Sequence, residues 1–132
     1  MLYRMPFAVH LDEGTGVLHI RGIGEVKDTE LADLSKRVRE HPAFIAGCAL
    51  LYDGSAATAH SLSANLIQSL ARAARGDKNP FAFIMPSAAG FGLASMYQIL
   101  SDVENDRIPV FENSRDAVVW LQSAMTARRR DP

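Results

Sequence analysis

The 132-residue sequence contains a single cysteine, Cys48, and carries a formal net charge of only −1. One cysteine excludes both an intrachain disulfide and a metal site built from several cysteines. A charge so near zero excludes the basic field by which nucleic-acid-binding proteins attract phosphates, so we expect no nucleic-acid partner. Because Cys48 stands at the start of an apolar run, the sequence predicts a buried thiol of low reactivity.

Long apolar stretches are also missing from the sequence. No run reaches the roughly 18 residues that suggest a membrane-spanning helix, and residues 1–20 lack the pattern of a signal peptide. The sequence therefore predicts a cytoplasmic protein with no membrane span. The basic stretch at about 126–132 contains three consecutive arginines and predicts a solvated tail.

The four histidines lack the spacing of a metal site. His10 and His19 fall in predicted strands, His41 precedes a proline, and His60 follows a run of small residues. No two of them stand four residues apart on a predicted helix, as zinc-binding histidines often do. We therefore expect neither a metal nor a cofactor.

What the sequence does contain is enough apolar material for one domain over residues 1–132, since 48% of its residues are hydrophobic. Two short alternating runs, 6–11 and 17–22, flank the turn residues 12–16 and predict a β-hairpin. Apolar residues at helical spacing predict a helix over 28–40, which ends at His41 because the next residue is a proline.

Strands and helices alternate along the rest of the chain. Residues 48–53, CALLYD, form a continuous apolar run that predicts a strand buried on both faces. The later elements are expected as a helix over 61–74, a strand over 81–85, a helix over 89–104, a strand over 108–111 and a helix from Asn113 or Ser114. The order β-β-α-β-α-β-α-β-α predicts an α/β fold with a mixed, mostly parallel sheet.

Asp53, Gly54 and Ser55 come directly after the predicted strand of residues 48–53. In open α/β sheets, ligands bind at the carboxyl ends of parallel strands, which makes these residues candidates for a binding loop. The alternative is that the two polar side chains satisfy the backbone of a turn. The sequence leaves both interpretations open.

A hydrolase would use Ser55 or Ser61 as nucleophile and His60 as base. The sequence argues against this hypothesis because no G-x-S-x-G elbow follows a predicted strand. Neighbours in sequence such as His60 and Ser61 also rarely present the geometry of a nucleophile with its base. We therefore expect a protein without enzymatic activity.

A second candidate loop follows the strand of residues 81–85. Ser87, Gly90 and Gly92 stand where a helix begins, and small residues there can expose backbone amides to an anion. However, no lysine completes a P-loop pattern, so the glycines can equally serve close packing of helix on sheet. If the protein binds a small ligand, we expect this loop and the one at 53–60 to share one edge of the sheet.

Taken together, these patterns resemble the SpoIIAA-like, or STAS-like, family of small bacterial proteins. The resemblance runs from about residue 7 to residue 123. Its motifs follow one another in the family's order: the hairpin with Gly14 and Gly22, LLYD ending at Asp53, FAFIMP, GLASMY at 92–97 and VFENSRDAVVWL at 110–121.

The resemblance implies a mixed, mostly parallel sheet and kinship with anti-sigma-factor antagonists. Those proteins bind a kinase-like anti-sigma partner and are switched by phosphorylation in a D-S-S-G motif where a helix begins. The corresponding place in this chain is near 59–62, which makes Ser61 the candidate phosphoacceptor. No aspartate precedes Ser61, and its hydroxyl has an alternative role as the cap of the next helix.

The sequence as a whole favours a non-enzymatic, regulatory protein-binding module with a protein partner in bacterial signalling. Its surface is expected at residues 54–61, with Ser63 and Asn65 from the following helix. The alternative is a domain that binds or senses a small ligand, a nucleotide or a lipid, through loops 53–60 and 86–92. Both a monomer and a homo-oligomer fit the sequence.

Overall fold

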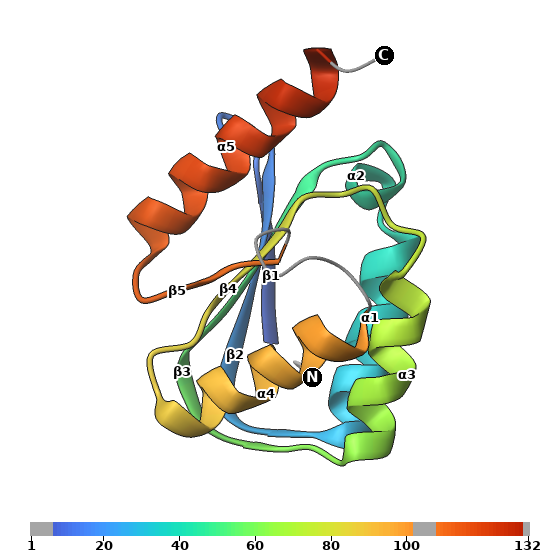
Figure 1. The fold of residues 1–132 in the computed structure, drawn as a ribbon, viewed down its shortest axis with the longest axis vertical. Coiled ribbons are helices and arrows are strands. Elements are labelled where there is room, and N and C mark those ends of the chain that lie inside the picture. Colours follow the sequence, from blue (N-terminus) through green and yellow to red (C-terminus); the bar gives the residue numbers. More distant parts are fainter. Residues whose placement is uncertain (1–6, 102–107, 131–132) are drawn as a thin grey trace, which may run out of the picture.

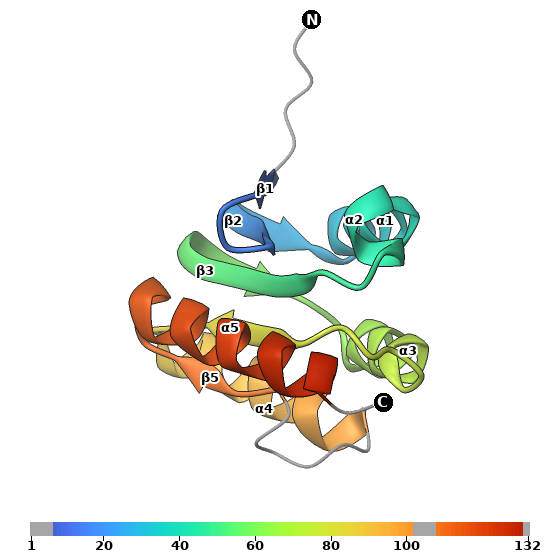
Figure 2. The ribbon, with the colours of Figure 1, turned by 90° about the horizontal axis from the view of Figure 1, so that it is seen from above.

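The centre of the molecule is a five-stranded sheet with helices on both of its faces (Figures 1 and 2). The computed structural model describes residues 7–101 and 108–130. The elements are β1 (Phe7–Asp12), β2 (Val17–Lys27), α1 (Asp28–Glu40), α2 (Pro42–Ile45), β3 (Ala49–Ser61), α3 (Ala64–Ala74), β4 (Phe81–Ile84), α4 (Ala88–Leu100), β5 (Val110–Phe111) and α5 (Ser114–Arg130).

The strands lie in the sheet in the same order as in the sequence, β1 to β5. β1 pairs antiparallel with β2, and the other three pairings are parallel. This arrangement confirms the predicted α/β fold with a mixed, mostly parallel sheet. Since each crossover from β2 to β5 steps in one direction, α1, α3 and α4 cover the same face, and α5 covers the opposite one (Figure 1).

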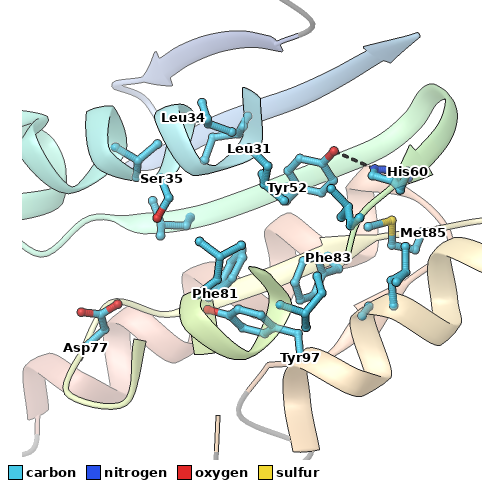
Figure 3. Close-up of a pocket in the computed structure, with 18 of the residues that line it drawn as sticks. Leu31, Leu34, Ser35, Tyr52, His60, Asp77, Phe81, Phe83, Met85 and Tyr97 are labelled. Atoms are coloured by element: carbon cyan, nitrogen blue, oxygen red, sulfur yellow. Dashed lines mark hydrogen bonds between the residues drawn. The ribbon is translucent and has the colours of Figure 1, made fainter. Parts of the chain in front are cut away.

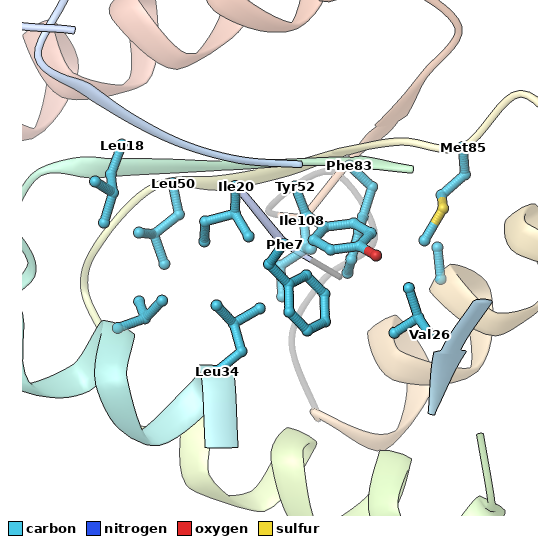
Figure 4. Close-up of a cluster of buried hydrophobic side chains, with 12 residues drawn as sticks. Phe7, Leu18, Ile20, Val26, Leu34, Leu50, Tyr52, Phe83, Met85 and Ile108 are labelled. Atoms are coloured by element: carbon cyan, nitrogen blue, oxygen red, sulfur yellow. The ribbon is translucent and has the colours of Figure 1, made fainter. Parts of the chain in front are cut away.

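Alternation along the strands divides the buried side chains into two cores. One core lies under α1, α3 and α4 (Figure 4), and the other lies under α5. Leu50 and Tyr52 of β3 belong to the first core, whereas Ala49 and Leu51 belong to the second. The apolar run of residues 48–53 is therefore buried on both faces, as its continuous hydrophobic character predicts.

The largest correction concerns β3, which does not end at Asp53 but continues to Ser61. Small residues with weak strand preference hide this extension in the sequence. The neighbouring β2, which also runs beyond its predicted end at residue 22, supplies the pairing that holds it. The two strands stay paired as far as Lys27 and Ser61, through irregularities between Arg21 and Ile23 and between Gly24 and Glu25.

Several helix boundaries also differ from the prediction. α3 begins at Ala64 rather than at 61, and α4 runs from Ala88 to Leu100 instead of over 89–104. The short helix α2 was not expected; it forms because His41 Nδ1 accepts a hydrogen bond from the Ala43 amide, 3.0 Å away, and Pro42 suits a first helical turn. Residue 6 of the expected hairpin and residues 102–104 lie outside the described residues.

The basic stretch that the sequence suggests as a tail is helical as far as Arg130. Within it, Arg128 Nη1 donates a hydrogen bond to the Gly47 carbonyl over 3.1 Å. The side chains of residues 126–128 are exposed, as expected of a solvated stretch, but these residues belong to α5 instead of a tail, and Arg128 attaches this end of the helix to the loop before β3. Residues 131–132 lie outside the described residues.

Candidate functional site

A cavity of about 130 Å³ lies between the sheet and helices α1, α3 and α4 (Figure 3). Its wall is mostly apolar and includes aliphatic side chains from all three helices, such as Leu34, Leu70 and Leu93. The cavity borders the larger of the two cores, where side chains usually interdigitate and leave little space. This apolar cavity is therefore the candidate site for a bound molecule.

Four aromatic rings line the cavity, three from strands β3 and β4 and one from helix α4. Tyr52 and Phe83 meet edge to face with ring centroids 6.1 Å apart, and Phe81 and Tyr97 do so at 5.8 Å. Phe83 and Tyr97 are also perpendicular, with centroids at 5.6 Å. Such pairs are mutually favourable arrangements of ring quadrupoles. These contacts join the four rings into one continuous aromatic wall along the space.

At one end of the cavity, the Tyr52 hydroxyl and His60 Nε2 are hydrogen-bonded over 2.8 Å (Figure 3). The extension of β3 beyond Asp53 carries His60 to this place, eight residues after its partner. Gly22 makes the contact feasible, because a Cβ at that position would collide with the Tyr52 hydroxyl. Burial lowers the pKa of His60 and raises the pKa of Tyr52, so both groups are uncharged at neutral pH.

At the other end, Arg39 of α1 and Asp77, which follows α3, form a two-pronged ion pair with N···O distances of 3.0 and 2.7 Å. Asp77 precedes β4 and His60 lies near the end of β3. The two polar ends of the cavity therefore lie at opposite ends of the parallel strands, the amino end and the carboxyl end (Figure 3). The hydrogen bond to Asp77 raises the pKa of Arg39. Arg39 also lies over the Phe44 ring, 5.5 Å from its centroid.

Two further groups complete the wall. Burial raises the pKa of Tyr97 to about 12, which keeps its hydroxyl protonated. Met85 closes the side next to His60, and its sulfur lies against two glycines: a Cβ on Gly54 would be 2.6 Å from it, and one on Gly90 would be 3.2 Å away. Both glycines therefore serve close packing around Met85.

The residues that the sequence suggests as a loop after β3 have local roles within the strand. Asp53 Oδ1 accepts a hydrogen bond from the Ser55 amide over 2.8 Å, which is the turn-like contact foreseen as the alternative to a ligand site. The prediction that they lie beyond the strand is wrong, since β3 continues past them. Among these residues, His60 alone lines the cavity.

Ser61 is exposed at the end of β3, and its hydroxyl donates to Glu25 Oε2 over 2.7 Å. It does not cap α3; that role belongs to Ser63, whose Oγ accepts from the Leu66 amide over 3.1 Å. His60 is occupied by Tyr52 while Ser61 is occupied by Glu25, so the two neighbours do not form a nucleophile and base pair.

The second candidate loop is the start of α4. Ser87 Oγ accepts a hydrogen bond from the Gly90 amide over 3.0 Å and caps the helix, so this amide is already used. Gly90 is buried, whereas a Cβ on Gly92 would meet open space. Close packing therefore explains Gly90 and does not explain Gly92.

Sequence reasoning missed the side chains that shape the cavity, namely Tyr52, Phe81, Phe83, Tyr97, Arg39 and Asp77. One signal was available: Phe81 and Phe83 stand two residues apart on a buried strand and so point to the same face. The pairing of Arg39 with Asp77 spans 38 residues, and no local pattern announces it.

Two negative findings apply to the residues that the structure describes. They contain no group of three histidine, cysteine, aspartate or glutamate side chains able to hold a metal ion. None of their helices is both long and apolar enough to cross a membrane.

Comparison with known proteins identifies the fold. An uncharacterised protein of the DUF3478 family from Shewanella loihica PV-4, which has a SpoIIAA-like fold, matches with a TM-score of 0.59 and 16% sequence identity. The match covers 92% of this chain and 98% of that one. No family model matches the sequence, and no curated protein matches it either. At this identity the likeness shows the fold alone, and it confirms the SpoIIAA-like architecture that the sequence predicts.

Proposed function

We propose that this chain, which has a SpoIIAA-like fold, binds a small apolar molecule in the cavity between its sheet and helices α1, α3 and α4. The observation that carries the proposal is a space of about 130 Å³ beside the main core, lined by aromatic and aliphatic side chains and partly open to solvent. A small number of polar groups at the ends of an otherwise apolar pocket is the usual composition of a ligand site.

Energetics supports this role over a simple packing defect. Space without atoms costs a protein the contacts that its lining would otherwise make. Water finds polar partners only at the two ends of the cavity, and a buried water needs two to four of them, so the apolar middle suits water poorly. The braced rings of Phe83 and Tyr97 nevertheless keep the space from closing. A bound apolar molecule would restore the missing contacts.

The same geometry favours an apolar ligand over a nucleotide. A phosphate needs free amides or cations, but the Gly90 amide is bound to Ser87 and the Arg39 guanidinium is bound to Asp77. The Gly90 amide and the Arg39 guanidinium therefore do not offer a nucleotide phosphate an unoccupied site. Of the two ligand classes that the sequence suggests, the nucleotide does not suit this site, and an apolar ligand, which shares only its apolar character with a lipid, does.

The test is binding of small apolar molecules, from pentane and benzene to decanol, followed by methyl NMR shifts of the cavity residues. Ala94 is 1% exposed and lines the cavity, so Ala94→Leu should fill part of the space and weaken binding at least tenfold. Ala89→Leu on the exposed side of the same helix is the matched control and should bind as the wild type does. The proposal fails if the wild type binds none of the molecules, or if Ala94→Leu binds them equally well.

A second candidate, the regulatory protein-binding module expected from the sequence, is supported by the outer surface of α4. Phe91 is 53% exposed and Ile99 is 72% exposed, and their spacing of eight residues puts them on one side of the helix. Apolar side chains exposed along one stripe are typical of surfaces that bind a partner. If this hypothesis holds, a partner captured by the wild type should be lost in a Phe91→Ser, Ile99→Ser double variant.

Phosphorylation of Ser61 remains part of that second proposal. A phosphate there would replace the hydroxyl that now donates to Glu25 and would face its carboxylate, so modification would break the contact by charge repulsion. We expect Ser61→Asp to change partner affinity and Ser61→Ala to leave it nearly unchanged. Equal binding by both variants and the wild type would remove support for a phosphorylation switch.

A further inference from the structure

We infer that the molecule held in the cavity is uncharged, has the size of a single six-membered ring, and carries one hydroxyl group that hydrogen-bonds the Tyr52–His60 pair. This inference rests on the proposed ligand-binding function and narrows it to a chemical class. The probe that represents the class is phenol.

The volume sets the size of the ligand. A buried apolar cavity of about 150 Å³ accommodates benzene in another, engineered protein. The space here, about 130 Å³, is similar and is lined by rings that can meet a guest ring edge to face. A ring with one small substituent would fill this volume, whereas a long acyl chain would fill it and extend beyond its lining.

The charges of the wall exclude an ionised ligand. Arg39 and Asp77 neutralise each other through two hydrogen bonds, so a carboxylate would have to displace Asp77 to reach the guanidinium. His60 is half-buried, and its surroundings favour the neutral imidazole. A charged guest would therefore lose its hydration without gaining a counter-charge from the described lining residues.

The Tyr52–His60 pair specifies the polar group of the ligand. If Tyr52 donates to His60 Nε2, the phenolic oxygen still has a lone pair that can accept one more hydrogen bond. If His60 donates instead, the Tyr52 O–H is left to donate. A ligand hydroxyl can act as donor or acceptor, so it can add a hydrogen bond to the pair in either tautomer, whereas a hydrocarbon can add none.

The experiment compares toluene, phenol, benzoate and decanol by calorimetry at pH 7.5 with the full chain. Since a net hydrogen bond contributes modestly, phenol should bind about 3- to 10-fold more tightly than toluene. Benzoate should bind at least tenfold more weakly than phenol, and decanol should bind more weakly than phenol as well. In Tyr52→Phe the advantage of phenol over toluene should disappear, while toluene binding persists and reports that the cavity is intact. Ser61→Ala, outside the cavity, should behave as the wild type.

The outcomes separate the two proposals. The inferred ligand class would be overturned if toluene and phenol bound with equal affinity, or if benzoate or decanol bound more tightly than phenol. Any of these results would leave a ligand-binding function in place. If Tyr52→Phe does not fold, the ranking of the four molecules on the wild type still decides. If the wild type binds none of the four molecules and none of the hydrocarbons of the wider panel, the proposed function itself is overturned.

Discussion

The two faces of the sheet are built from the same strands and yet pack in opposite ways. Under α5, the core residues are between 0 and 2% exposed, and three of them are alanines, Ala49, Ala82 and Ala117. Under α1, α3 and α4, alternate positions of the same strands carry Tyr52, Phe83 and other rings, and there the cavity remains.

The difference shows how residue size at alternating strand positions decides whether a core closes. Leu51 and Ala82 point to α5, and their immediate neighbours Tyr52 and Phe83 point to the other side. Small side chains let one helix approach the sheet closely. Braced rings beneath three separate helices leave space that no single helix can fill. Stability should therefore be concentrated on the α5 face and binding on the three-helix face.

The difference in packing between the two faces is tested most strongly by a leucine-to-alanine substitution on each face. Leu121→Ala removes a side chain that is 0% exposed under α5 and should lower the free energy of unfolding by about 2–5 kcal/mol. Leu70→Ala, in the cavity wall, should cost roughly half as much, because Leu70 is only half-buried and already borders empty space. Urea unfolding of both variants measures the difference, and a larger loss from Leu70→Ala would contradict the contrast between faces.

A second pair of variants tests the packing around Met85, where the cavity closes beside His60. Gly54→Ala places a Cβ 2.6 Å from Met85 Sδ and 3.3 Å from the Ile84 carbonyl oxygen, so it should cost about 1–3 kcal/mol. Gly92→Ala meets open space on a helix and should raise stability by about 0.5–1 kcal/mol. Opposite signs in thermal unfolding are the expected result. A neutral Gly54→Ala would mean that Met85 moves aside without cost.

The sequence predicts the fold better than the site, and the reason is the range of the interactions involved. The hairpin, the helix at 28–40 and the doubly buried run at 48–53 follow from local periodicity, and each forms as expected. The extension of β3 depends on pairing with β2, so the weak strand preference of residues 55–59 misleads a local reading.

The cavity could not be predicted from the sequence, because it depends on contacts between residues that are distant along the chain. Gly22 gives space to the Tyr52 hydroxyl, and Arg39 of α1 meets Asp77 of the segment between α3 and β4. The sequence suggests His60 as the base of a hydrolase or as part of a binding loop, whereas its partner in the structure is a tyrosine on its own strand. Residue types alone indicated a polar site at the end of a strand; only the fold reveals an apolar space with polar ends.

The ion pair at one end of the cavity should contribute moderately to the stability of the fold. Arg39 and Asp77 have side chains 33 and 24% exposed, so part of their attraction is screened by solvent. Asp77→Asn should lower stability by about 1 kcal/mol through loss of the charge-assisted bonds. The control is Asp33→Asn, whose partner Arg37 lies one helical turn away in a more exposed pair, with an expected loss of about 0.3–0.5 kcal/mol. Equal losses from both variants would show that burial adds nothing to the Arg39 pair.

The smallest effect on stability is expected from His60, at the opposite end of the cavity, and it depends on pH. Burial lowers its pKa in the folded protein below the ordinary value of 6.5, so the unfolded chain takes up a proton first as the pH falls. The stability that His60 contributes is therefore complete above pH 6.5 and is lost between that pH and its lower folded-state pKa. Urea midpoints measured from pH 7.5 to 5 should fall less steeply in His60→Gln than in the wild type. Ala89→Leu, an exposed variant that changes no titratable group, should keep the wild-type slope. If His60→Gln also keeps that slope, the imidazole is not held neutral by the cavity wall, and this end is open to water in a way that the Arg39 end is not.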